Sequence, residues 1–243
     1  METTGSRVGA EAPKSYVLIG LGGIGCRVAG GLAPFLYSTG ERPSLLLVDG
    51  DRFEEANRGR MAFRRLGPKP EVLSEDLAES HGDRLTLIPF PRYVTEKNVR
   101  RLIGEGDVVF CMPDNHATRR LVDVRCCELR DVALFSGGND DTADGKTGTY
   151  GNVQIHLRKE GRDLTNPLGR YHPEIAHPED GLPTDQGCLA NAASAPQVLF
   201  TNLTVAAMML AAFYAWRAGR LEYEEAYLDI LSGRTVTVRR QVA

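Results

Sequence analysis

The chain has 243 residues, of which 42% are hydrophobic and 25% are charged. This length is enough for one large α/β domain or two small ones, and this composition is typical of a globular protein with a well-formed core. The formal net charge of −3 argues against a nucleic-acid-binding surface, and five cysteines without a regular framework favour a reducing, cytoplasmic environment.

The N-terminal residues 1–14 are polar and contain glycine and proline, so we expect a flexible arm there. They lack the apolar segment of a signal peptide. We expect residues 15–243 to form one domain.

A glycine-rich turn directly follows the first predicted strand, at residues 16–19, and precedes a helix expected to begin near Ile24. The turn contains Gly20, Gly22, Gly23 and Gly25. Residues without a Cβ atom permit a tight turn and a close approach of the backbone to a phosphate, which the helix N-terminus would also attract. The pattern predicts a bound nucleotide, although a turn that only packs a helix on a sheet would have the same composition.

A second buried strand is predicted at residues 44–48, after a helix that we expect to end near Ala33 because Pro34 follows. The strand leads into Asp49 and Asp51. Asp49 lies 24 residues beyond the last glycine of the turn, close to the ~20 expected for an acid that binds ribose hydroxyls. An acid that only caps the strand end is the alternative.

The next segment is short, polar and rich in cations. It contains Asn57, Arg58 and Arg60, and Lys69 follows directly before a helix predicted at residues 70–80. A triphosphate needs such cations, because its charge must be neutralised before a nucleophile can reach phosphorus. A solvated basic loop is the alternative.

Strands are predicted next at residues 85–89 and 108–111, with a short helix capped by Thr95 between them. Asp114 follows the second of these strands, before a helix expected at residues 116–130. The ligand crevice of a doubly wound sheet lies along such strand ends. Asp114 is therefore placed to cap the helix, to hold Mg²⁺ on a triphosphate, or to do both.

The C-terminal part is expected to change the direction of the sheet. It should contain a strand at 132–135, an antiparallel strand at 150–157, an irregular crossover loop at about 158–195, an apolar helix at 198–216 opened by Ser194 and Pro196, and a β-hairpin at 223–239. Thr201, Asn202 and Thr204 interrupt the apolar helix, so we expect it inside the protein or at a subunit contact and not in a membrane. The expected fold is a Rossmann-like, doubly wound, mostly parallel sheet with antiparallel C-terminal strands.

These motifs occur in the order typical of the ThiF/MoeB-like superfamily of ubiquitin-activating enzymes, which the chain resembles from about residue 15 to residue 213. The matching pieces are the Gly20–Gly25 motif, Asp49-Gly50-Asp51, Asn57 with Arg60, Gly67-Pro68-Lys69, and Asp114-Asn115 with Thr118-Arg119. Within the superfamily the chain is similar to minimal bacterial members, such as the ThiF-like proteins of PRTRC-type gene clusters.

The resemblance implies adenylation, dependent on ATP and Mg²⁺, of the C-terminal carboxylate of a small ubiquitin-like protein that ends in glycine. It also implies a homodimer, to which the helix at 198–216 contributes. The implied roles are ATP binding by the glycines, Asp49 and Asp51, phosphate contacts by Asn57, Arg60 and Lys69, and positioning of Mg²⁺ by Asp114. No general base is needed, because a carboxylate is already ionised at neutral pH.

Cys188 matches the crossover-loop cysteine of the family by its spacing to Pro196. In some relatives that cysteine accepts the acyl group, and in others it is dispensable. A thiolate there would be a competent nucleophile, and an ordinary small residue in a loop is an equal alternative.

Some features depart from the family pattern. The short N-terminal arm is expected to lack the helix that, in relatives, lends an arginine to the neighbouring subunit, and Arg7 or Arg58 is the alternative source of that charge. The zinc-binding cysteine pairs of the family are missing, Met61 replaces a glutamine, and Gly50 replaces a bulkier residue. His172 and His177 lie in a proline-rich stretch without a third ligand, which argues against a metal there.

Three other functions fit part of the pattern. An NAD-dependent oxidoreductase would use the glycines and Asp49 but would leave Arg60, Lys69 and Asp114 without a role. A ThiF-like scaffold would hold a partner without activating it. Activation of a tRNA base or of a small carboxylate is the third, and the lack of a basic surface disfavours the tRNA version.

Overall fold

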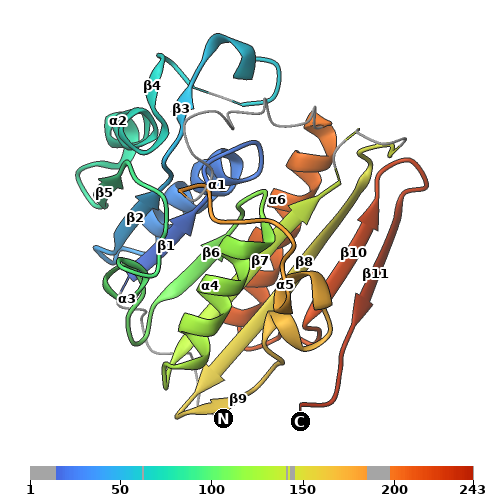
Figure 1. Ribbon diagram of the computed structural model, residues 1–243. Coiled ribbons are helices and arrows are strands. Elements are labelled where there is room, and N and C mark those ends of the chain that lie inside the picture. The colour runs from blue at the N-terminus through green and yellow to red at the C-terminus, as the bar shows by residue number, and fades with distance from the viewer. Residues whose placement is uncertain (1–14, 62, 141, 143–145, 185–197, 243) are drawn as a thin grey trace, which may run out of the picture.

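The computed structural model describes residues 15–61, 63–140, 142, 146–184 and 198–242. The predicted N-terminal arm and Cys188 lie outside these residues. A nine-stranded sheet crosses the molecule in the order β11-β10-β8-β7-β6-β1-β2-β5, with β9 beside β8 (Figure 1). The parallel strands are β1 (Ser15–Ile19), β2 (Ser44–Val48), β5 (Thr86–Phe90), β6 (Val108–Cys111) and β7 (Val132–Asn139).

Antiparallel strands complete the sheet on the side of β7. They are β8 (Tyr150–Lys159), β9 (Arg162–Asp163), β10 (Glu225–Asp229) and β11 (Arg234–Val238). The predicted fold class, a mostly parallel Rossmann-like sheet with antiparallel C-terminal strands, is therefore confirmed.

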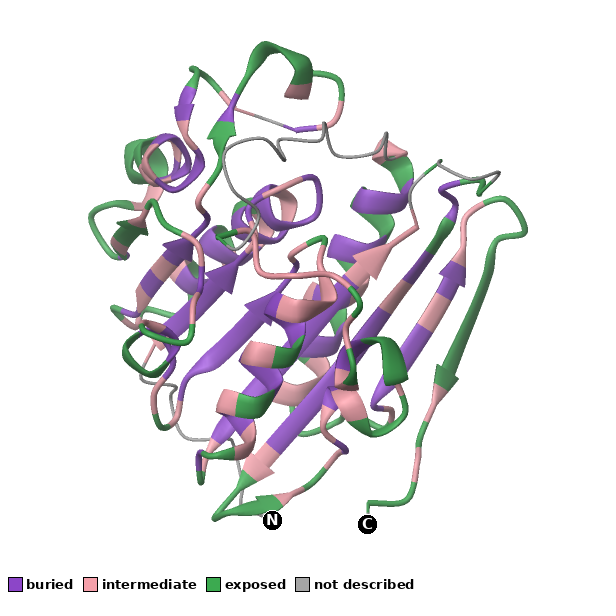
Figure 2. Ribbon diagram, viewed as in Figure 1, coloured by how far each residue is buried: buried purple, intermediate pink, exposed green. Residues whose placement is uncertain are grey.

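Helices cover both faces of the sheet because successive residues of a strand point to opposite sides. Tyr16 and Leu18 of β1 face α1 (Gly25–Ser38) and α6 (Leu199–Arg217), whereas Val17 and Ile19 face the side of α4 (His116–Cys127). Figure 2 shows the central strands buried and the outer strand β11 exposed. The remaining helices are α2 (Lys69–His81), α3 (Val99–Leu102), α5 (Pro173–Ala176), and the 3₁₀ turns η1 (Glu55–Asn57) and η2 (Leu168–Arg170).

The ends of two helices differ from those predicted: α4 ends at Cys127 and not near Arg130, and α1 continues past Pro34. The first helix was expected to end near Ala33, but α1 includes Pro34 and continues to Ser38. Proline leaves the carbonyl of Gly30 without its helical donor. Gly30 and Pro34 both lie on the exposed side of the helix, where water can satisfy that carbonyl, and the buried Leu36 beyond them holds the last turn on the core.

The other corrections concern caps. Asn115, and not Asp114, caps α4, because its side-chain oxygen accepts a hydrogen bond from the Thr118 amide at 2.8 Å. The helix expected from Thr95 is only α3, preceded by Asn98. Similarly, α6 begins after Val198; Ser194 and Pro196, which were expected to open it, lie outside the described residues.

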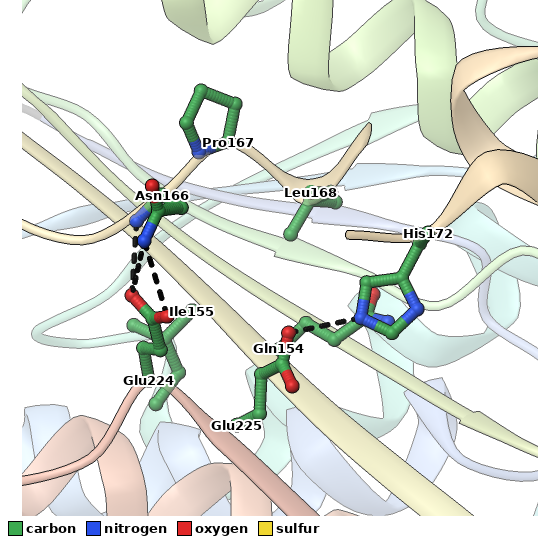
Figure 3. Close-up of a pocket in the computed structure, with 8 residues that line it drawn as sticks. All are labelled: Gln154, Ile155, Asn166, Pro167, Leu168, His172, Glu224 and Glu225. Carbon is green, nitrogen blue, oxygen red and sulfur yellow. Dashed lines mark hydrogen bonds and ion pairs between the residues drawn. The ribbon is translucent and has the colours of Figure 1, made fainter. Parts of the chain in front are cut away.

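The first part of the expected irregular crossover loop is ordered by contacts with the C-terminal hairpin (Figure 3). The Asn166 amide and side chain donate to Glu224 at 3.0 and 3.2 Å, and His172 Nε2 lies 2.9 Å from Glu225. This segment also contains β9, η2 and α5. The prediction of a structureless segment was wrong here, because the groups that order it lie more than 50 residues away in sequence.

Glu225 is nearly buried and is surrounded by donors. Burial alone raises the pKa of its carboxyl group, but hydrogen bonds from Arg240, Tyr227 and His172 together hold that pKa below its usual range. A carboxyl group with a lowered pKa in the folded chain contributes stability above its unfolded pKa, and this contribution is lost as the pH falls through its folded pKa.

We therefore expect Glu225→Gln to lower the free energy of unfolding by about 1–3 kcal/mol at pH 7, as measured by urea denaturation. The deficit should shrink as the pH falls below about 4.5. Glu222→Gln, at an exposed position of the same stretch, is the control and should have little effect at any pH. A deficit that is constant across this pH range would contradict the assigned role of the Glu225 charge.

Candidate functional site

A pocket opens where the carboxyl ends of β1, β2 and β6 meet. On one side of β1 the chain crosses to β2 and β5, and on the other side to β6 and β7, so the strand order reverses between β1 and β6. Ligands of open α/β sheets bind at this switch point. The residues around the pocket include Gly20, Asp49, Asp51, Tyr93, Asp114 and Asn115.

The fold itself requires glycine at two positions of the turn. Gly20 has a φ of +85°, and a Cβ atom there would lie 2.7 Å from the backbone of Met112. A Cβ atom on Gly25 would lie 1.9 Å from the carbonyl oxygen of Gly20. At Gly22 the nearest atom would be the Met61 methyl group at 3.7 Å, an ordinary contact. Close packing thus accounts for the first and last glycines but not for Gly22.

Asp49 ties the glycine turn to the end of β2. One carboxylate oxygen accepts from the Leu21 amide at 2.6 Å, and the other accepts from the Asp51 amide at 2.8 Å. Burial raises the pKa of this carboxyl group, and the nearby Lys69 opposes that effect. Asp49 therefore supports the turn and also lines the pocket, so the two interpretations of this residue are compatible.

Lys69 lies at the start of α2 with its ammonium group almost fully buried. Its Nζ atom is 2.8 Å from Asp51 Oδ2 and 3.5 Å from Asp49 Oδ2. Burial lowers the pKa of Lys69, but the two carboxylates more than offset this effect and the pKa is raised. Burial raises the pKa of Asp51, but the charge of Lys69 and the hydrogen bonds from Lys69 and Tyr93 outweigh it. The pKa of Asp51 is therefore lowered.

Arg119 fixes the loop that carries Asp114. Its buried guanidinium group donates to the carbonyl oxygens of Pro113 and Gly137, both at 2.8 Å, and to Ser136 Oγ at 2.7 Å. The Asp114 side chain is exposed in the pocket. Arg119, a residue of the family motif, therefore acts as a positioning residue for this loop.

Two pocket features were not predicted from the sequence. The Tyr93 ring lies over Gly50, where a Cβ atom would come within 2.5 Å of it, and the Tyr93 hydroxyl bonds to Asp51. This contact explains the small residue at position 50. In addition, Asp180 of the crossover segment accepts from the His116 and Ala117 amides, each at 2.7 Å, and so covers the N-terminus of α4.

Asn57 and Arg60 lie on a neighbouring segment and do not line the pocket. The Asn57 side chain accepts from the Glu54 amide at 2.9 Å and closes η1. Arg58 pairs with Glu55 and lies over the Phe63 ring. The segment is anchored where β3 (Arg52–Phe53) pairs with β4 (Gly67–Pro68), and Met61 packs into a hydrophobic cluster beneath it.

The structure thus brings Gly20, Asp49, Asp51 and Asp114 together, with Lys69 behind the two aspartates that follow β2. It defines an α/β protein with a doubly wound, Rossmann-like sheet and an acidic crevice at its switch point. The ThiF family matches residues 12–222, and the chain belongs to the ThiF family. The resemblance seen in the sequence is thereby confirmed.

Solved structures share this fold at low sequence identity. A structure of E. coli MccB with succinimide superposes with a TM-score of 0.69 at 15% identity, covering 93% of this chain and 63% of that one. A structure of PaaA superposes with a TM-score of 0.67 at 15% identity, covering 93% of this chain and 64% of PaaA. A structure of E. coli MccB with AMPCPP and MccA superposes with a TM-score of 0.68 at 15% identity, covering 95% of this chain and 64% of that one. The chain thus spans less than two thirds of the length of these proteins. No curated protein matches the chain by sequence.

Replacement of Lys69 by methionine tests the buried charge network. We expect Lys69→Met to lower the free energy of unfolding by about 3 kcal/mol, because it leaves the Asp49 carboxylate buried without its cation. The double variant that combines Lys69→Met with Asp49→Asn should lose less stability than the two single variants together. In urea denaturation, its loss of unfolding free energy should be smaller than the sum of the single losses by at least about 1 kcal/mol.

The exposed Lys97 provides the control, and Lys97→Met should change stability by less than about 0.5 kcal/mol. Additive losses in the double variant would show that Lys69 and Asp49 do not stabilise each other.

Proposed function

We propose that the chain binds ATP in the crevice and adenylates the C-terminal carboxylate of a peptide or small protein. The observation that carries this proposal is the pocket at the switch point, where the glycine turn, Asp49 and Asp114 converge. Membership in the ThiF family supports it. The structures of E. coli MccB with ATP, and with AMPCPP and MccA, support it by analogy.

In the proposed reaction, a carboxylate oxygen of the partner attacks the α-phosphorus of ATP. The new O–P bond forms as the bond to the bridging oxygen breaks, and pyrophosphate leaves with that electron pair. No proton has to move, because the attacking carboxylate is already ionised. The positive end of the α1 helix dipole and the Lys69 ammonium can stabilise negative charge on the phosphates.

Mg²⁺ fits the crevice by the chemistry of its donors. Asp114 presents an exposed carboxylate there, and Mg²⁺ prefers one or two carboxylates together with phosphate oxygens. When bound, the ion would neutralise charge on the triphosphate. Arg119 would keep Asp114 in place through its bond to the neighbouring Pro113 carbonyl.

For the partner, we propose a ubiquitin-like protein with a C-terminal glycine. We also propose that Cys188 then accepts the acyl group, and that the reaction takes place in the cytoplasm.

A catalytically inactive scaffold is the second candidate function. It is favoured by one observation: the Lys69 ammonium is held by Asp49 and Asp51 and is not directed into the pocket as a free cation.

ATP–pyrophosphate exchange tests adenylation directly. With Mg²⁺ and small diglycine-ended proteins from the same genome, we expect exchange that falls about 100-fold or more in Asp114→Ala, because the substitution removes a group that positions charge stabilisation at the phosphates. Asp83→Ala, on the surface outside the pocket, should retain exchange. Cys188→Ala should also retain exchange but should lose any thioester to the partner.

The other outcomes separate the alternatives. Binding of ATP without exchange, for every partner tried, would contradict the enzyme and favour the scaffold. Binding of NAD in place of ATP would favour an oxidoreductase.

We also propose that α6 forms a homodimer contact. Val205, Met209 and Phe213 are buried against the sheet, whereas the opposite side exposes Phe200 and Tyr214 by 67% and 62%. Exposed Leu203, Ala207 and Ala211 lie between them at helical spacing. By length and composition α6 could also cross a membrane, with a mean hydropathy of 1.5, but a core or interface helix passes the same test. A second copy would cover this apolar stripe.

We expect sedimentation velocity to show a dimer that becomes a monomer in Ala207→Arg, because an unpaired charge would be buried at the centre of the contact. Val236→Arg, on the exposed face of β11, should leave the dimer intact. A monomeric wild-type chain would overturn this proposal, and binding of the chain to lipid vesicles would favour a membrane contact for α6.

A further inference from the structure

Three metal-binding side chains converge between α4 and the sheet, away from the crevice. Asp123 and Cys127 lie four residues apart on α4, which places them on the same face of the helix. His156 of β8 lies opposite and is fully buried. One ligand atom from each of the three residues lies within 4.8 Å of the other two. Neither the family resemblance nor the proposed reaction uses this cluster.

The orientation of His156 leaves one nitrogen without a hydrogen bond. Its Nε2 atom is 2.9 Å from Asp163 Oδ1, so Nε2 carries the proton that makes this bond. Its Nδ1 atom is buried and has no hydrogen-bond partner among the described residues, yet it lies only 3.4 Å from Asp123 Oδ1. A buried acceptor nitrogen therefore faces a carboxylate oxygen, and a cation between them would give the nitrogen the partner that it lacks.

The spacing of these two atoms fits a tetrahedral metal ion. Bonds of about 2.0–2.1 Å from zinc to nitrogen and oxygen place two tetrahedral ligands roughly 3.3 Å apart. The surrounding contacts also orient the ligands: Asp163 holds the imidazole of His156, and the Asp123 carboxylate accepts from the Leu168 and Gly169 amides at 2.9 and 3.0 Å. Such outer contacts are typical of metal-bound histidine and carboxylate.

The charges of the cluster also balance for a divalent ion. Arg158 pairs with Asp163 and donates to the carbonyl of Leu129, so the charge of Asp163 is already neutralised. The remaining negative charges are the Asp123 carboxylate and a Cys127 thiolate, which together equal the charge of the ion. Thiolate and imidazole select zinc over the harder cations Mg²⁺ and Ca²⁺.

We propose that Asp123, Cys127 and His156 bind Zn²⁺ with three protein ligands and one further position open to water. On binding, the Cys127 thiol loses its proton to solvent as the sulfur–zinc bond forms. The ion would link α4 to β8 and, through the amides bonded to Asp123, to the crossover segment at η2. This site is independent of the proposed adenylation, since it lies beyond the first two turns of α4 from the crevice.

Cobalt substitution of the full-length protein tests the site. After treatment with a chelator, addition of Co²⁺ should produce visible d–d bands of a tetrahedral ion and a near-ultraviolet charge-transfer band from thiolate. Cys127→Ser should lose the charge-transfer band, and Asp163→Asn should weaken Co²⁺ and Zn²⁺ binding about 10- to 100-fold. Zn²⁺ should raise the melting temperature of the wild type and have a smaller effect on Cys127→Ser.

Cys126→Ser is the matched control, because Cys126 is the adjacent cysteine but is buried in the hydrophobic cluster of this face; it should keep the charge-transfer band. Cys111→Ser, also within that cluster, serves the same purpose if Cys126→Ser does not fold. Absence of the band in the wild type, or its persistence in Cys127→Ser, would overturn the proposal. If the wild type shows no charge-transfer band, a proton shared between His156 and Asp123, and not a metal ion, would lie between the two side chains.

Discussion

The crevice depends on one buried carboxylate, that of Asp49. It accepts the amide of Leu21 in the glycine turn and the amide of Asp51 beyond β2, and it lies beside the ammonium group of Lys69 at the start of α2. Three separate segments are thereby fixed at the end of one strand. An ionised group in such a place is costly unless it is paired and hydrogen-bonded, so the shape of the pocket and the stability of this edge of the sheet have the same physical origin.

Other parts of the molecule are also organised by buried charges that reach across the sequence. Arg119 joins the loop after β6 to β7, and Glu224 and Glu225 hold the crossover segment against the C-terminal hairpin. Each of these groups is buried and bonded to donors or acceptors on a different element. The hydrophobic layers on the two faces of the sheet give the fold its bulk, whereas these polar contacts determine where its loops lie.

This division explains how much the sequence could predict. The strands at β2 and β6 and the glycine turn between β1 and α1 were predictable, since local apolar runs and glycines are sufficient to identify them. Asp49, Asp51 and Asp114 were placed correctly at strand ends. The bonds that Asp180 accepts from the first amides of α4, and the packing of Tyr93 on Gly50, were not predictable, because each joins residues more than 40 positions apart. The end of α1 was predicted wrongly at Pro34, because a helix can accommodate a proline on the side that faces water, and the sequence did not show which side that is.

The energetics of Lys69 bear on whether the crevice can serve an enzyme. Its two carboxylate partners differ in exposure: the side chain of Asp49 is 7% exposed, whereas that of Asp51 is 50% exposed. Water screens the Asp51 end of its pair with Lys69, whereas a fully buried pair costs several kcal/mol to break. A triphosphate oxygen could therefore replace Asp51 beside the ammonium group while Asp49 remains ion-paired with it. The bond from Lys69 to Asp51 thus favours a scaffold only as long as no phosphate oxygen takes the place of the Asp51 carboxylate.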